Sequence, residues 1–120
     1  MGLDMTAYSL ENAPEAEVDF PCGGNLVEIA YWRKHPNLHG WMEQLYRKKG
    51  GADEYFNCSA VALSTEDINK LEKELDNLPP TTGFFFGHSR PEDRHLDLAF
   101  IARAREEIAK GRTICYSAWW

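Results

Sequence analysis

The chain has 120 residues, of which 43% are hydrophobic and 27% charged, and its formal net charge at pH 7 is −6. This length is enough for one domain with its own hydrophobic core and too short for two. A net negative charge repels nucleic-acid phosphates unless the cations are gathered on one face, so the composition disfavours a nucleic-acid partner.

The N-terminal part of the chain shows little hydrophobic patterning. Residues 1–14 have no period and end in Asn-Ala-Pro, which predicts a flexible arm ahead of a single domain over residues 15–120. A short edge strand is expected over residues 15–20, where apolar and acidic residues alternate. Residues 25–34 begin like a capped helix, with Asn followed three residues later by Glu, but their β-branched and aromatic composition favours a strand.

Three helices are predicted in the rest of the chain. Apolar residues at helical spacing mark the first over residues 36–49, where Pro36 suits the first turn and Asn37 is a candidate cap. The second begins after Ser64, whose hydroxyl is followed by an acidic third position in the manner of a capping box, and Pro-Pro ends it. The third runs from about residue 92 to residue 110 and is closed by glycine.

Two further strands complete the predicted fold. They are expected over residues 55–63 and 112–120, and the Phe-rich segment 83–87 is expected to be a buried strand or a tight loop. This order of elements predicts a single α+β domain, with about three helices packed on one face of a small, mostly antiparallel sheet.

Cysteine usage and hydropathy indicate the cytoplasm. The three cysteines, Cys22, Cys58 and Cys115, lie far apart and form no CxxC motif, which is typical of a reducing compartment. No apolar run approaches the roughly 20 residues that a membrane span needs. The N-terminus also lacks the basic and then apolar pattern of a signal peptide. We therefore expect a cytoplasmic protein that makes no membrane contact.

The aromatic residues suggest a contact surface. Tryptophans flank a cation in the segment Ile29–Met42, and two more tryptophans end the chain. Together they are candidates for an aromatic and cationic platform, on which each stacked base would gain about 1–3 kcal/mol. The alternative is that these tryptophans belong to the core and that the cation is solvated. The candidate binding residues are Trp32, Arg33, His39, Trp41, Trp119 and Trp120, and the last two are the best candidates for a contact surface or a dimer seam.

Two parts of the chain that contain histidine are candidate sites of chemistry. His35 and His39 have the spacing of two metal ligands on one helix, but Pro36 places the first of them at or before the helix start. We therefore expect a capping or surface His35, a hydrogen-bonded His39, and no metal or cofactor. His95 could act as a base oriented by Asp93 or Asp97, although a charged loop of this kind is more often simply solvated.

Three segments carry a family resemblance. IAYWRKHPNLHGWM at residues 29–42, TTGFFFG at residues 81–87 and the terminal YSAWW occur here in one order. In this order they resemble a family of small uncharacterised proteins encoded by bacteriophages and prophages, over residues 29–120. The resemblance implies a phage origin and an intracellular life in the host bacterium, and it implies no activity. Some members are named phosphoglycerate kinase, which a chain this short with no nucleotide motif does not support, and Pro36 departs from the family pattern.

These observations predict a non-enzymatic phage accessory protein that binds a host or phage protein, with a homodimer as a further candidate. The alternative is a small-ligand binding protein or enzyme that meets a nucleotide or other anion with Arg33, His39 and His95. A flat aromatic patch would favour the first interpretation, and a closed polar cavity at His39 would favour the second.

Overall fold

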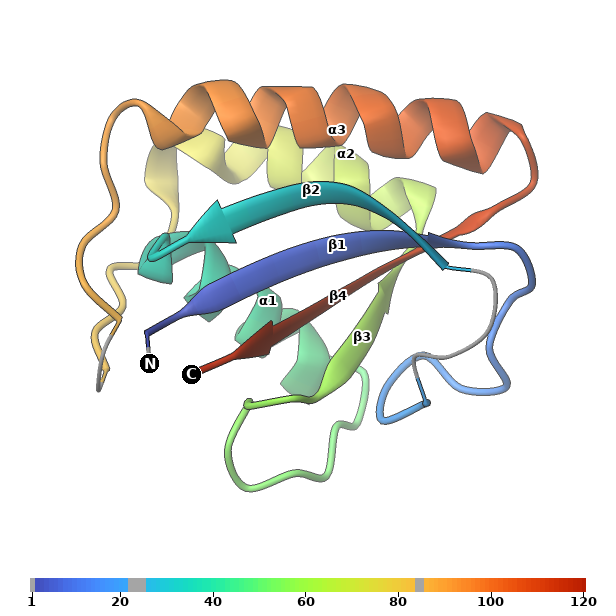
Figure 1. Cartoon of the computed structure of the whole chain (residues 1–120), viewed down its shortest axis with the longest axis horizontal. Coiled ribbons are helices and arrows are strands. Elements are labelled where there is room, and N and C mark those ends of the chain that lie inside the picture. Colours follow the sequence, from blue (N-terminus) through green and yellow to red (C-terminus); the bar gives the residue numbers. More distant parts are fainter. Residues whose placement is uncertain (1, 22–25, 84–85) are drawn as a thin grey trace.

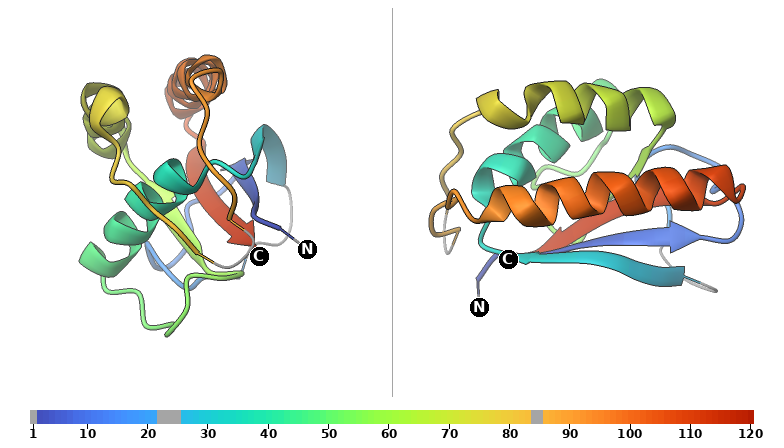
Figure 2. Two further views of the ribbon diagram at one scale, coloured as in Figure 1. Left: turned by 90° about the vertical axis from the view of Figure 1, so that its left-hand side faces the viewer. Right: turned by 90° about the horizontal axis from the view of Figure 1, so that it is seen from above.

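In the computed structural model, a four-stranded antiparallel sheet carries three α-helices on one face (Figures 1 and 2). The structure describes residues 2–21, 26–83 and 86–120. The strands are β1 (Asp4–Leu10), β2 (Leu26–Arg33), β3 (Ala60–Leu63) and β4 (Thr113–Trp119), in the order β2-β1-β4-β3. The helices are α1 (Pro36–Lys48), α2 (Thr65–Glu74) and α3 (Asp93–Ala109), and a short 3-10 turn η1 (Leu75–Asn77) follows α2. The predicted α+β class is confirmed.

The prediction of a flexible arm over residues 1–14 is wrong for β1, which lies inside the sheet. β1 pairs with β2 on one side and with β4 on the other. Its helix-facing side chains, Met5, Ala7 and Ser9, are fully buried. Two of the three are small, so the alternation that normally marks a strand is faint in the sequence. Pairing on both sides and the burial of Met5 and Ala7 in the core hold this segment in place.

The strand interpretation of residues 25–34 is confirmed by β2, and Asn25 lies outside the described residues. A register shift between Ala7 and Tyr8 bends the β1–β2 pair. Lys34 then takes a left-handed backbone conformation, with φ of 62°, and turns the chain into α1. Pro36 occupies the first turn of α1 as predicted, but His35 rather than Asn37 is the N-cap residue, and it makes no side-chain capping bond.

Other predicted boundaries hold in part. The capping box at Ser64 is confirmed, because its hydroxyl accepts the Asp67 backbone N–H and the Asp67 carboxylate accepts the Ser64 N–H. The strand predicted over residues 55–63 is limited to β3, and that predicted over residues 15–20 is a single bridge from Val18 to Val61. Of the segment 83–87, residues 84 and 85 lie outside the described part of the chain.

The two faces of the sheet differ in cover. The core lies between the helices and the inner face, where Trp32, Tyr116 and Ile114 pack with side chains of α1, α2 and α3. On the outer face, Phe20 packs near β3 and β4 in a smaller cluster with Ala60 and Cys115. The rest of the outer face, over the ends of β2 and β4, carries exposed side chains. No helix among the described residues is long and apolar enough to cross a membrane.

Candidate functional site

The six predicted binding residues fall into two groups in the structure. Trp32, His39 and Trp41 are buried in the core. Trp120 is half-buried, where its Nε1 donates to the Phe56 carbonyl at 2.8 Å. Arg33 and Trp119 are exposed, and the chain brings these two together on the outer face of the sheet.

Strand register explains why Arg33 and Trp119 lie close. Asp4 in β1 pairs with Arg33 of β2 on one side and with Trp119 of β4 on the other, so the three side chains form one row on the outer face. The Arg33 guanidinium lies 3.4 Å from the Asp4 carboxylate. Tyr31 lies two residues before Arg33 on the same face of β2 and donates its hydroxyl to the same carboxylate at 2.5 Å. We call Tyr31, Arg33, Asp4 and Trp119 the outer-face row.

The outer-face row stays open to solvent. Trp119 is 68% exposed and Tyr31 is 45% exposed, values that are high for aromatic side chains at the end of a sheet. Two glycines with positive φ stand beside the same corner. A Cβ on Gly2 would lie 3.0 Å from Arg33 Nη2, and a Cβ on Gly87 would lie 2.9 Å from Lys34 Cδ. Both glycines therefore leave room for the neighbouring cationic side chains.

His39, in contrast, is sealed inside an aromatic cage. Its ring stacks on Phe56 with centroids 4.9 Å apart and meets Phe86 edge-on at 5.2 Å. Its Nδ1 lies 2.7 Å from the Tyr116 hydroxyl. Burial lowers the pKa of His39 to about 4, although the Phe56 carbonyl favours the charged form, and burial raises the pKa of Tyr116 well above its ordinary value. Tyr116 therefore stays protonated and donates to a neutral His39.

His35, four residues earlier, is also buried but lies in a polar cluster. Its Nδ1 is 2.7 Å from the Ser89 hydroxyl, and its Nε2 is 3.0 Å from Asp97 Oδ2. The other oxygen of Asp97 accepts the Trp32 indole N–H at 3.0 Å. Asp93 Oδ2 lies 3.7 Å from His35 Nδ1. Ser89, His35 and Asp97 thus form a continuous chain of hydroxyl, imidazole and carboxylate.

Four different elements hold this cluster together. Trp32 comes from the end of β2, His35 from the N-cap of α1, Ser89 from the loop before α3, and Asp97 from the second turn of α3. Asp93 and Asp97 are four residues apart, so both carboxylates point from one face of the helix toward His35. The Asp93 carboxylate also accepts the Arg90 backbone N–H at 2.8 Å, which fixes the loop that carries Ser89.

A pocket opens beside this cluster. It has a volume of about 450 Å³, and its lining includes His35, Ser89 and Asp97 on one side and Leu75 and Leu78 on another. Arg90 and Arg94 also line it, and Arg94 forms an ion pair with Asp76. This volume lies within the roughly 300–1,000 Å³ typical of small-molecule sites. A hydroxyl that faces an oriented imidazole at the wall of a pocket is arranged for proton transfer.

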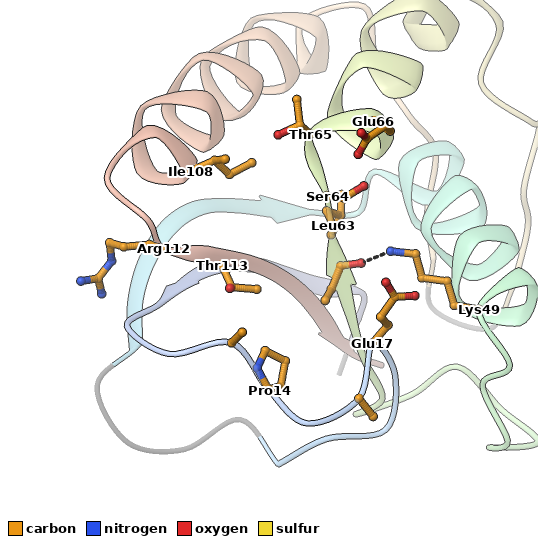
Figure 3. A pocket seen from close by; sticks show the side chains of 13 residues that line it. Pro14, Glu17, Lys49, Leu63, Ser64, Thr65, Glu66, Ile108, Arg112 and Thr113 are labelled. Atoms are coloured by element: carbon orange, nitrogen blue, oxygen red, sulfur yellow. Dashed lines mark hydrogen bonds between the residues drawn. The ribbon is translucent and has the colours of Figure 1, made fainter.

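A second pocket, of about 490 Å³, lies between the start of α2 and the ends of α3 and β3 (Figure 3). Its cations already have partners in the fold. Lys49 donates to the Ala62 carbonyl at 2.5 Å and to the Asp67 carboxylate at 2.6 Å (Figure 3 draws the first bond). Arg112 donates to the Ser9 hydroxyl at 2.7 Å. These bonds therefore tie the ends of the surrounding elements together.

The sequence pointed to the carboxylates of the His35 cluster but not to their partner. Asp93 or Asp97 was a candidate to orient His95, with a solvated charged loop as the favoured alternative, whereas His95 is exposed on α3 and the structure places His35 against both carboxylates. His35 was expected at the surface or as a cap, because the following proline ends the strand without indicating what the side chain meets. Within the described parts of the chain, no three His, Cys, Asp or Glu side chains are arranged to hold a metal ion.

Comparison with known proteins assigns neither a family nor a function to the chain. No protein-family model, no curated protein and no solved structure matches the chain.

Proposed function

We propose that this protein is a phage or prophage accessory protein that acts in the cytoplasm of the host bacterium by binding another protein. The observation that carries the binding role is the outer-face row, in which an exposed tryptophan, an exposed tyrosine and an arginine surround Asp4 on one face of the sheet. Tryptophan, tyrosine and arginine are the residues most enriched at the energetic centres of protein interfaces. The phage origin rests on the resemblance of three sequence segments.

The chemistry of the row favours a partner that presents a carboxylate next to an apolar side chain. Trp119 offers a broad apolar surface at the end of β4, and the Arg33 and Lys34 cations lie at the end of β2. Arg33 retains a side chain that is 53% exposed despite its contact with Asp4. An ion pair exposed to this extent contributes only about 0–1 kcal/mol. A partner carboxylate can therefore replace Asp4 at small cost.

The test compares two matched variants of the same chain. Trp119→Ala removes the exposed ring from the outer face, and Leu98→Ala removes an exposed apolar side chain from α3, on the helical layer. Proteins that are cross-linked by the wild type in a bacterial lysate are identified, and the strongest is purified for direct titration. We expect Trp119→Ala to weaken its binding at least 10-fold and Leu98→Ala to change it less than 2-fold.

Charge reversal tests the second half of the proposal. Replacing Arg33 and Lys34 together by Glu should weaken binding and reverse its dependence on salt, because salt would then screen a repulsion from the partner carboxylate instead of an attraction to it. A partner that bound Trp119→Ala and the charge-reversed variant as tightly as it bound the wild type would show that the outer-face row is not the contact surface.

A further inference from the structure

We propose that Ser89, His35 and Asp97 form a nucleophilic site that takes an acyl group from a small uncharged carboxylic ester. This activity is independent of protein binding at the outer-face row, because the two sites share no residue. The site is carried by geometry: a half-buried serine hydroxyl lies against a buried histidine, and a buried carboxylate holds the opposite nitrogen of that histidine.

The hydrogen bonds define one direction for the proton. Ser89 Oγ already accepts the Asn37 backbone N–H at 3.0 Å, so its own hydrogen is free to be donated to His35 Nδ1. Asp97 accepts the proton on His35 Nε2 and accepts the Trp32 indole N–H with its second oxygen. Its carboxylate is thus held from two sides and cannot rotate away. Such a chain of hydroxyl, imidazole and carboxylate is recognised by its geometry and not by its order in sequence.

The charge that forms on His35 during reaction has a ready counter-charge. When Nδ1 takes the serine proton, the ring becomes a cation between Asp97 at 3.0 Å and Asp93 at 3.7 Å. All three side chains are buried, where attraction between opposite charges is stronger than in water. The second carboxylate therefore stabilises the protonated ring that a general base must become.

The pocket selects the substrate class. Leu75, Leu78 and Pro91 give it an apolar wall that suits a short acyl chain. Its charged side chains are already balanced, because Arg94 pairs with Asp76 and Arg90 lies 3.7 Å from Asp93. An uncharged ester enters without breaking these pairs. Arg90 and Arg94 line the pocket, and each guanidinium keeps N–H donors outside its ion pair that can donate to the oxyanion developing on the ester carbonyl.

The reaction balances without any co-reactant except water. Ser89 Oγ forms a bond to the carbonyl carbon while its proton passes to His35 Nδ1, and the bond from that carbon to the alkoxy oxygen breaks. The alkoxy group takes the proton from His35 and leaves as an alcohol, so Ser89 carries an acyl ester. Water then attacks this ester, gives its proton to His35, and releases a carboxylic acid as Ser89 recovers its proton.

A purely structural role makes a different prediction. In that case the Ser89 hydroxyl only caps α1 by accepting the Asn37 N–H, since the N-cap residue His35 makes no side-chain capping bond. The cluster would then only tie the loop before α3 to the start of α1. Ser64 offers the matched comparison, because its hydroxyl caps α2 and has no histidine among its hydrogen-bond partners. A serine that only caps should react with an acyl donor no faster than Ser64.

The experiment uses p-nitrophenyl acetate on the full chain, followed by peptide mass spectrometry. We expect an acetyl group on Ser89 at least 10-fold above that on Ser64, and a burst of nitrophenol equal to the protein concentration. Asp97→Asn should lower Ser89 acetylation at least 10-fold, because the amide favours the wrong tautomer of His35. Equal acetylation of Ser89 and Ser64 in the wild type would overturn the proposal. This comparison within one chain does not depend on any variant folding.

Discussion

His35 and His39 lie four residues apart at the start of α1, and both are buried, with 4% and 1% of their surfaces exposed. Their surroundings are nevertheless opposite. His39 meets three aromatic rings and one hydroxyl, whereas His35 meets a serine and two carboxylates at the wall of a pocket. Burial alone therefore does not assign a role to a histidine. The neighbours decide whether the ring stays neutral inside the core or can carry a proton for chemistry.

The largest expected effect comes from removing His39. His39→Ala should leave a cavity among Phe56, Phe86 and Tyr116 and deprive the Tyr116 hydroxyl of its partner. Removing a large buried ring costs about 3–5 kcal/mol, and an unsatisfied buried hydroxyl adds about 1–3 kcal/mol. Urea unfolding followed by tryptophan fluorescence should show a loss of at least about 3 kcal/mol. A loss below about 1 kcal/mol would mean that the cage does not hold the core.

The next effect is the loss of stability in acid that comes from the burial of His39. Because burial lowers the pKa of folded His39 to about 4 from 6.5, the unfolded chain binds more protons between these values. Stability from this group is therefore fully present above about pH 6.5 and is lost as the pH falls toward about 4, by about 3 kcal/mol in total. His39→Phe keeps a ring in the cage and should remove this part of the pH dependence.

The comparison with His39→Phe is needed because the protonation of several carboxylates also destabilises the fold in acid. Hydrogen bonds from Tyr46 lower the pKa of Asp19, and Arg105 lowers the pKa of Glu72, so both groups stabilise the fold less as they become protonated. Their contribution is common to the wild type and His39→Phe and cancels in the difference. Identical pH profiles for the two proteins would show that His39 is not protonated on unfolding.

The sequence predicted the fold better than it predicted the polar clusters, for a physical reason. Helix caps and strand composition act over a few residues, so the capping box at Ser64 and the strand β2 were evident in the sequence. The strand β1 was not predicted, because Ala7 and Ser9 are too small to mark its buried side in the sequence. The bond between His35 and Asp97 spans 62 residues, and only the packing of α3 against β2 brings the two together.

The next expected effect is that of Asp97→Asn, which should change the free energy of unfolding less than it changes the acetylation of Ser89. The amide oxygen can still accept the Trp32 N–H, and its NH₂ group then faces His35 Nε2. His35 must shift its proton to Nδ1 and donate to Ser89, so the network survives with its direction reversed. We expect a loss of about 1–2 kcal/mol in urea unfolding, in line with one weakened charged hydrogen bond. A loss above about 4 kcal/mol would mean that the cluster is mainly structural.

The smallest expected effect compares two serines that cap helices. Ser64→Ala removes the hydroxyl of the capping box at α2, and Ser89→Ala removes the acceptor for the Asn37 N–H at α1. Loss of a capping hydroxyl costs about 1 kcal/mol in either variant, and Ser89→Ala also removes the hydrogen bond to His35 Nδ1, so thermal and urea unfolding should show it to be less stable than Ser64→Ala by about 1 kcal/mol. Ser89→Ala, but not Ser64→Ala, should abolish the burst of nitrophenol released from p-nitrophenyl acetate. A small difference in stability beside a large difference in reactivity would separate capping, which both serines perform, from nucleophilicity, which only the serine beside His35 is placed to acquire.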